Sequence, residues 1–159
     1  MDAIRASSNI ETASAGAGAR RAQRATIQLV MDTADLLSRV IDSDAVRGMI
    51  FLGIIAANTR HLRAGSPDAQ AYAQTGTIVP DSARRGISVH ALSHEVNMPY
   101  ETARRHVQRL IKSGRIERVE DGVVVPDTVF ADYDTQGLTA KNYTNVRRFL
   151  DQLRDIGVI

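Results

Sequence analysis

Charged and polar side chains recur on one side of the segment from Tyr100 to Ser113, whose apolar residues follow a helical period. At 100° per residue, the side away from the apolar residues carries Glu101, Arg105, Gln108 and Lys112, with Arg104 on the flank. Guanidinium groups bind phosphate oxygens and guanine through paired hydrogen bonds, so these residue types predict a surface that contacts nucleic acid. The plainer alternative is a solvated helix face, which accounts for most charged runs.

Further polar side chains lie at the two ends of this segment. Tyr100 and Glu101 stand at its N-terminal end, and contact with nucleic acid is one interpretation of Tyr100. Packing of Tyr100 onto the preceding turn is an equally good interpretation. Arg118 lies beyond the segment, where we expect it to contact the DNA backbone, although Arg115 and Arg118 can also pair with neighbouring glutamates.

Two histidines, His90 and His94, are four residues apart and therefore share one face of the preceding helix. This spacing suits a pair of metal ligands, but no acidic or cysteine partner completes a site and the HExxH signature is absent. We therefore predict no metal site and expect these histidines to contact phosphates or water. We also expect Ser88 and His90, at the start of that helix, to contact nucleic acid.

Local patterns predict the elements that hold these side chains. A first helix has Ser88 as its expected N-cap and apolar residues at helical spacing, namely Val89, Leu92 and Val96. Residues 97–99 break the pattern, because Asn97 tolerates a left-handed backbone and Pro99 suits the first position of a new helix. The chain is therefore expected to turn sharply before Tyr100.

The segment after the turn is predicted to form a second helix followed by a β-hairpin. The apolar side of this helix consists of Ala103, Val107, Leu110 and Ile111. Gly114 is well placed to end it in a left-handed conformation. Residues 115–119, the pair Asp121-Gly122 and residues 123–125 then read as two strands around a tight turn, and Ile87 is expected to add a small strand.

This order of elements resembles the winged helix-turn-helix domain of bacterial transcription regulators, a grouping that includes the MarR-like, GntR-like and IclR-like families. The matching positions are Ala91-Leu92, Met98, Thr102-Ala103, Val107, Leu110, Gly114 and Ile116. The departure is Asn97, where such domains often have glycine; asparagine also visits the left-handed region. The resemblance covers residues 87–126 and implies sequence-specific binding of double-stranded DNA and control of transcription. It also implies that Tyr100 and Glu101 read bases, because the N-terminal half of the second helix enters the major groove in such domains.

Additional helices are predicted on both sides of this domain. Residues 1–22 are rich in Ala, Ser and Gly without apolar periodicity, so we expect a flexible tail. Residues 23–62 are predicted to form a helical dimerisation region, in which 25–41 carries one apolar stripe. A second helix follows, with N-cap candidates in Asp42-Ser43-Asp44, and serves as the first helix of the winged domain.

The remaining segments are a long loop and a C-terminal extension. Residues 63–86 form the loop, and because loops of more than about 12 to 15 residues tend to be functional or mobile, we expect one of these two properties here. Within it, Thr77–Val79 is predicted to be a short strand. In the extension, 127–159, a turn-like stretch around Asp132, Asp134 and Gly137 precedes a helix beginning near Thr139. Its apolar stripe comprises Tyr143, Val146, Leu150 and Leu153.

Composition limits the classes of protein to which the chain belongs. A chain of 159 residues with 43% hydrophobic residues can form one core, and a net charge of only +2 requires any basic surface to be local. The absence of cysteine excludes disulfides and Cys-ligated zinc. No apolar run approaches about 18 residues, so we expect neither a membrane span nor a secretory signal, and a cytoplasmic location.

The sequence therefore predicts a mainly α (α+β) winged helix-turn-helix with additional N- and C-terminal helices and a two-stranded wing. The sequence has no Gly-rich phosphate loop and no nucleophile elbow, and no two carboxylates can be located together in a cleft. We therefore expect neither an enzyme nor a cofactor. The surplus of apolar stripes predicts a homodimer built mainly from the N-terminal helices. The alternative function is an adaptor that binds proteins, and the sequence does not identify an operator or a small-molecule effector.

Overall fold

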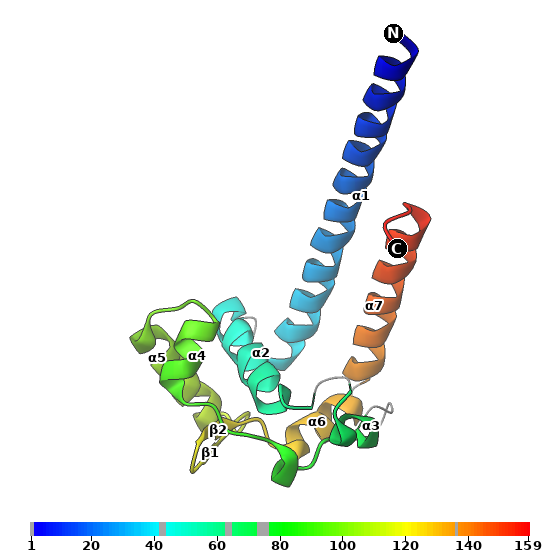
Figure 1. The fold of residues 1–159 in the computed structure, drawn as a ribbon. Helices are drawn as coiled ribbons and strands as arrows, with labels where there is room; N and C mark the ends of the chain where they lie inside the picture. The colour runs from blue at the N-terminus through cyan, green and yellow to red at the C-terminus, as the bar shows by residue number, and fades with distance from the viewer. Residues whose placement is uncertain (1, 42–43, 63–64, 73–76, 136) are drawn as a thin grey trace. The chain divides into compact units, whose positions relative to one another are not determined.

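The computed structural model describes residues 2–41, 44–62, 65–72, 77–135 and 137–159, with the side chains of 2–17, 40, 67–68 and 134–135 left out (Figure 1). The chain is mainly helical and has a two-stranded antiparallel sheet. It divides into two compact units, one formed by Met1–Leu36 with Thr139–Ile159 and the other by Leu37–Leu138. Among the described residues, no helix has the length and apolar character needed to cross a membrane.

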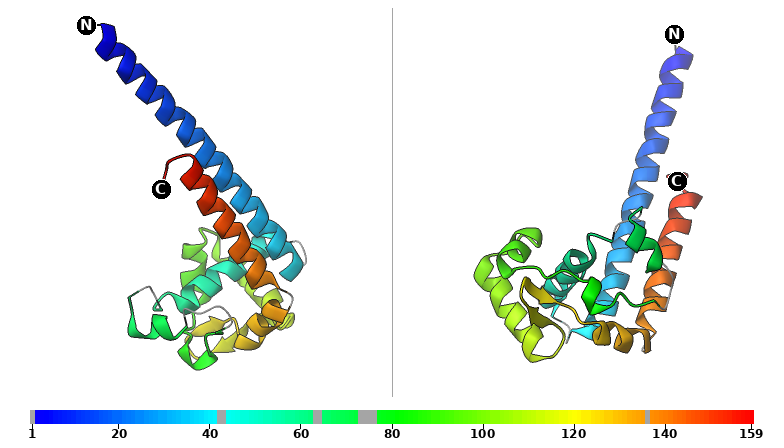
Figure 2. Two further views of the ribbon diagram at one scale, coloured as in Figure 1. Left: turned by 90° about the vertical axis from the view of Figure 1, so that its right-hand side faces the viewer. Right: turned by 60° about the horizontal axis from the view of Figure 1, so that its bottom comes forward.

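Three helices and a hairpin form the centre of the second unit (Figures 1 and 2). Helix α2 (Ala45–Thr59) packs against α4 (Val89–Glu95), α5 (Tyr100–Lys112) and strand β2. Strands β1 (Glu117–Val119) and β2 (Gly122–Val124) pair antiparallel, and a single bridge joins Ile87 to Val123. The expected small strand at Ile87 is thus reduced to one paired residue.

The core of this unit comes from one face of each element. Its largest fully buried apolar side chains are Ile50, Phe51, Ile54, Leu92, Val107, Leu110, Ile116, Val123 and Val125. Asn58 is buried among them. Its amide donates to the carbonyl oxygens of Arg85 (2.7 Å) and Val123 (3.2 Å) and accepts from the N–H of Val125 (2.9 Å). One polar side chain on α2 therefore holds the hairpin and the segment before α4.

The helix ends and turns follow the local signals. The carboxylate of Asp44 accepts from the Arg47 N–H at 2.9 Å and caps α2, whereas Asp42 and Ser43 lie outside the described residues. Asn97 adopts φ 51°, as expected for the turn before α5. Pro99 is the N-cap rather than the first residue of α5. Ser88 caps α4 by accepting from the Ala91 N–H at 3.2 Å.

Glycine is required at the hairpin turn. Gly122 adopts φ 137°, and an added Cβ would lie 2.2 Å from the Ile87 carbonyl oxygen. The turn therefore needs glycine for its backbone conformation and for the close approach of the segment before α4. Gly114 also has a positive φ, 69°, which confirms the left-handed end expected for α5.

Two predictions for the connecting segments were wrong. Thr77–Val79 forms no strand, because the Val79 carbonyl oxygen accepts from the Arg84 guanidinium instead of a ladder partner. The described part of the long loop also contains α3 (Pro67–Ala71) and a 3-10 turn η1 (Asp81–Ala83). The stretch after Pro126 is helix α6 (Asp127–Thr135), since Val129 and Tyr133, four residues apart, both bury in the core.

The first unit pairs two long helices. Helix α1 (Asp2–Val40) runs antiparallel to α7 (Leu138–Asp155), and Figures 1 and 2 show them side by side. Ion pairs Lys141–Asp35 (3.3 Å) and Arg148–Asp32 (3.3 Å) join the helices. The expected tail over 1–22 is helical from Asp2, because its many alanines favour the helix without needing an apolar stripe.

Large apolar side chains of these two helices stay exposed. On α1 the exposed fractions are 55% for Ile27, 59% for Val30 and 60% for Met31. On α7, Tyr143, Val146 and Leu150 are exposed in the same way, whereas the polar Asn145 is buried. The antiparallel pair thus leaves two apolar stripes uncovered, which is the reverse of the usual arrangement.

Candidate nucleic-acid interface

Helix α5 presents its polar face to solvent. Its buried face is formed by Ala103, Val107 and Leu110, all fully inaccessible, with Ile111 half-buried beside them. The exposed face carries Glu101, Arg105, Gln108 and Lys112. The predicted division of this helix into two faces is therefore confirmed. Whether the exposed face binds DNA stays a prediction.

The basic residues of α5 differ in how they are held. Arg104 donates through Nε to Glu101 Oε2 at 3.0 Å, and its Nη2 lies 3.0 Å from the same oxygen. Arg105 has no hydrogen bond or ion pair with any residue that the structure describes. Because an exposed i,i+3 pair contributes little stability, Arg104 can exchange Glu101 for a group of a ligand, whereas Arg105 needs no such exchange.

Arg109 belongs to the same surface, although the sequence argument did not include it. It is exposed, one turn after Arg105, and forms no ion pair within the described part of the chain. With Arg105 and Lys112 it gives three cations at the i, i+4 and i+7 positions. The signal that identifies Arg109 is its helical spacing from Arg105 and Lys112, although it does not lie directly opposite the apolar side.

The start of α5 meets the two histidines of α4. The Tyr100 ring is 6.4 Å from the His90 ring, and the His90 and His94 rings are 4.7 Å apart. Tyr100 is 46% exposed, so it is available to a ligand while lying beside His90. The fold thereby brings together side chains from two helices that the sequence placed separately.

The hairpin of β1 and β2 carries one available cation and several carboxylates. Arg118 is exposed and pairs in register with Val123. Arg115 instead lies 3.6 Å from Asp132 and 6.0 Å from the Tyr133 ring, so it is held against α6. The turn between the strands carries Glu120 and Asp121, which repel phosphates. The positive charge of this surface thus lies on α5 and at Arg118 rather than at the turn between the strands.

The segment before α4 adds a basic residue that the sequence argument missed. Arg85 is exposed, and its backbone N–H donates to the Asn58 carbonyl oxygen at 3.2 Å. Beside it lies an open hollow of about 510 Å³, whose lining includes Ala91 and the pair Arg60–Glu95, joined at 2.6 Å. Local periodicity gives no signal for Arg85, because it belongs to no helix or strand.

A histidine on the flank of α5 is linked to the start of α2. His106 Nδ1 lies 3.7 Å from Asp44 Oδ2, and the imidazole is largely buried. Burial lowers the pKa of His106 below 6.5, although Asp44 acts in the opposite direction. The Arg47 N–H that hydrogen-bonds Asp44 lowers the pKa of that carboxyl. At neutral pH this contact therefore joins an uncharged imidazole to a carboxylate.

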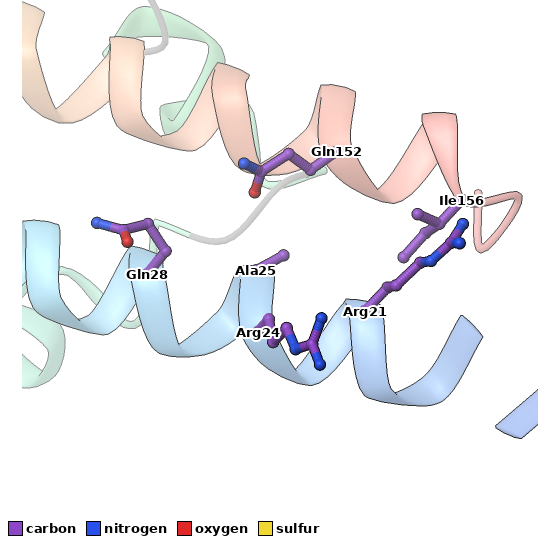
Figure 3. A pocket seen from close by; sticks show the side chains of 6 residues that line it. All are labelled: Arg21, Arg24, Ala25, Gln28, Gln152 and Ile156. Atoms are coloured by element: carbon purple, nitrogen blue, oxygen red, sulfur yellow. The ribbon is translucent and has the colours of Figure 1, made fainter. Parts of the chain in front are cut away.

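A separate hollow of about 350 Å³ lies between α1 and α7. Figure 3 shows side chains around it, with Arg21, Arg24 and Gln28 on α1, Gln152 on α7 and Ile156 directly after the end of α7. Both arginines are exposed. No buried atom without a hydrogen-bond partner belongs to the residues that line it. The hollow is thus a groove between two helices with nothing that specifies an occupant.

The chain matches no model of a protein family, no curated protein and no solved structure.

Proposed function

We propose that this chain is a cytoplasmic, bacterial transcription regulator that binds double-stranded DNA through a winged helix-turn-helix. The observation that carries the proposal is the exposed face of α5, where Arg105, Arg109 and Lys112 have no ion-pair partner among the described residues. Unpaired cations along one helix face suit the phosphates that flank a major groove. Neither a cofactor nor an enzymatic step is part of the proposal.

The proposed role of each residue is inferred from its position. Tyr100 and Glu101, at the N-terminal end of α5, are assigned to base edges together with Arg104, Arg105 and Gln108. The residues assigned to phosphates are Ser88, His90, Lys112 and Arg118. Ser88 keeps its hydroxyl hydrogen for a phosphate, because its oxygen serves as acceptor for the Ala91 N–H.

We further infer that the regulator is a homodimer. The motivating observation is the pair of exposed apolar stripes on α1 and α7, which a second copy of the same unit would cover. A two-fold axis then places two α5 helices in successive major grooves, about 34 to 36 Å apart, and requires a nearly palindromic site.

The competing function is an adaptor that binds other proteins. The carboxylates Glu120 and Asp121 at the wing tip, beside the exposed Val119, favour it. The two functions differ in their response to salt. An adaptor would show no binding to duplex DNA, whereas a DNA-binding protein loses affinity steeply as salt rises.

Fluorescence anisotropy with a random-sequence duplex tests the proposal. At low salt we expect binding, and a plot of the logarithm of affinity against that of salt should fall linearly as phosphate contacts are screened. Arg154→Ala, which removes an exposed cation from α7 that pairs with Asp151, is the matched control and should leave affinity unchanged. Absence of binding at low salt would overturn the proposal. If binding is observed, selection of bound genomic fragments would identify the operator.

A further inference from the structure

The first two turns of α5 hold a carboxylate and a guanidinium in contact with each other. Arg104 Nε donates to Glu101 Oε2 at 3.0 Å, and Arg104 Nη2 lies 3.0 Å from the same oxygen. The Glu101 side chain is 67% exposed and that of Arg104 is 40% exposed. The pair is therefore already formed within the chain and open to solvent.

Both residues keep hydrogen-bonding groups beyond their mutual contact. The two contacts end on Glu101 Oε2, so Oε1 remains an acceptor without a partner among the described residues. Arg104 meets Glu101 through Nε and Nη2, which leaves the outer end of the planar guanidinium, at Nη1, without a partner in the described part of the chain. Nη1 is not among the buried polar atoms that lack a hydrogen bond. A donor end and an acceptor oxygen of two touching groups are thus both accessible to a ligand.

The pairing determines how Glu101 would behave beside nucleic acid. A carboxylate without a partner on this face would be repelled by the phosphates. Arg104 brings the net charge of the pair to zero. Arg105 and Arg109, which form no ion pair with any described residue, are left to supply the attraction. The pair is therefore suited to discriminating between bases rather than to general attraction.

A purely structural role for Glu101 is the alternative. A carboxylate in the first turn of a helix interacts favourably with the helix dipole, and Glu101 lies in the first turn of α5. An exposed i,i+3 ion pair adds little further stability. Such a role places no requirement on the identity of a base, so base preference distinguishes it from recognition.

A donor end beside an acceptor oxygen matches one kind of base pair in the major groove. Guanine presents the acceptors O6 and N7 there, and cytosine presents the N4 donor next to them. Arginine is the usual partner of guanine, and glutamate accepts from cytosine N4. An A·T pair presents the adenine N6 donor where guanine presents O6, so it would face the guanidinium with another donor.

We propose that Glu101 and Arg104 act as one unit that reads a C·G base pair, in which Arg104 donates to guanine O6 and N7 while Glu101 Oε1 accepts from cytosine N4. This inference rests on the proposed function, because it specifies the base pair that the same face of α5 recognises. Within that function, the two residues determine sequence specificity, whereas Arg105 and Arg109 contribute attraction.

Mutual contact makes each residue of the pair depend on the other. Glu101 restricts the orientation of the guanidinium, so Arg104 loses less conformational freedom when guanine binds. Arg104 in turn neutralises the carboxylate that approaches the phosphates. Removal of either residue should therefore weaken both base contacts. The fold-losses of affinity from Glu101→Ala and Arg104→Ala should multiply to more than the loss in the double variant.

Selection from a pool of randomised duplexes, with the full chain at low salt, locates the base pair. We expect the wild type to enrich a motif in which one position is C·G, and Glu101→Ala to lose the preference at that position while keeping the rest of the motif. Gln108→Ala is the matched control, because it removes another exposed polar side chain of α5 and should retain the C·G pair. A motif shared unchanged by the wild type and Glu101→Ala would overturn the inference.

Base analogues at the selected position assign the two contacts in competition anisotropy. N4-methylcytosine keeps its pairing but replaces the major-groove hydrogen on N4, and 7-deazaguanine lacks the N7 acceptor. Each should weaken binding by the wild type at least about fivefold. Glu101→Ala should not respond to N4-methylcytosine, and Arg104→Ala should not respond to 7-deazaguanine. Inosine, which lacks only the minor-groove amino group of guanine, is the control and should leave affinity unchanged.

Two results of these titrations count against the pair. Equal affinity of the wild type for the unmodified duplex and for the N4-methylcytosine duplex would refute the cytosine contact. Losses that multiply fully in the double variant would refute the claim that the residues act as one unit. Both single variants should melt at the wild-type Tm, because the pair is exposed, so that a lost base preference reports recognition rather than folding.

The selection also separates this inference from the proposed function. An enriched motif whose base preferences do not depend on Glu101 would refute the inference and leave DNA binding intact. If the wild type enriches no duplex at low salt, it does not bind specific DNA, and both proposals are refuted.

Discussion

Asn58 is expected to be the most sensitive polar residue of the Leu37–Leu138 unit. Replacing it by alanine removes three hydrogen bonds with unequal consequences. The buried Val125 N–H loses its only hydrogen-bond partner among the described residues, at a cost of about 1 to 3 kcal/mol. The Val123 carbonyl oxygen keeps the Ile87 N–H at 3.1 Å, so its loss is about 0.5 to 1.5 kcal/mol.

The third bond contributes least. The Arg85 carbonyl oxygen is only partly buried, so water can replace the amide at a cost of about 0.5 kcal/mol. Together the three losses predict that Asn58→Ala lowers the free energy of unfolding by about 2 to 5 kcal/mol. This is a large share of the about 5 to 15 kcal/mol that stabilises a typical domain.

Urea unfolding followed by circular dichroism measures this loss. The control is Asn145→Ala, which removes another buried asparagine whose described hydrogen bond is to Arg148 in the same helix, at 2.5 Å. We expect Asn145→Ala to cost less than about 1.5 kcal/mol, because none of the described backbone groups loses a partner. If Asn58→Ala lowers stability by less than about 1 kcal/mol, Asn58 does not join α2 to the hairpin as we have argued.

Three further outcomes are expected. Arg105→Ala should weaken DNA binding by about 1 to 3 kcal/mol in anisotropy without changing Tm, and equal affinity would remove Arg105 from the interface. Because burial lowers the pKa of His106 below 6.5, the unfolded chain takes up its proton first. The contribution of this group to the free energy of unfolding is therefore fully present above pH 6.5 and is lost as pH falls through the folded pKa. His106→Gln should make the urea midpoint less dependent on pH over that window. An unchanged dependence of the midpoint on pH would refute the assignment. Val30→Asp, which puts a charge on the exposed α1 stripe, should convert a light-scattering dimer into a monomer, whereas a wild-type monomer at micromolar concentration would refute the homodimer.

The sequence by itself determined the segment from Ser88 to Val125, because each of its signals acts over a few residues. The spacing of Ala103, Val107 and Leu110 selects the buried face of α5, and this selection needs only the helical period. Asn97 and Gly114 indicate left-handed backbone through their own conformational preferences. The exposed positions of Arg105 and Lys112 follow from the same period.

The tertiary structure alone decided what depends on residues far apart in the chain. Asn58 finds partners at Val123 and Val125, 65 and 67 residues away, and no local pattern identifies such partners. Thr77–Val79 has strand-forming residues, yet Arg84 captures the Val79 carbonyl oxygen. The His61 side chain likewise meets the Ala83 carbonyl oxygen, 22 residues away, at 2.8 Å. Propensity acts along the chain, whereas burial and hydrogen-bond pairing are properties of the packed fold.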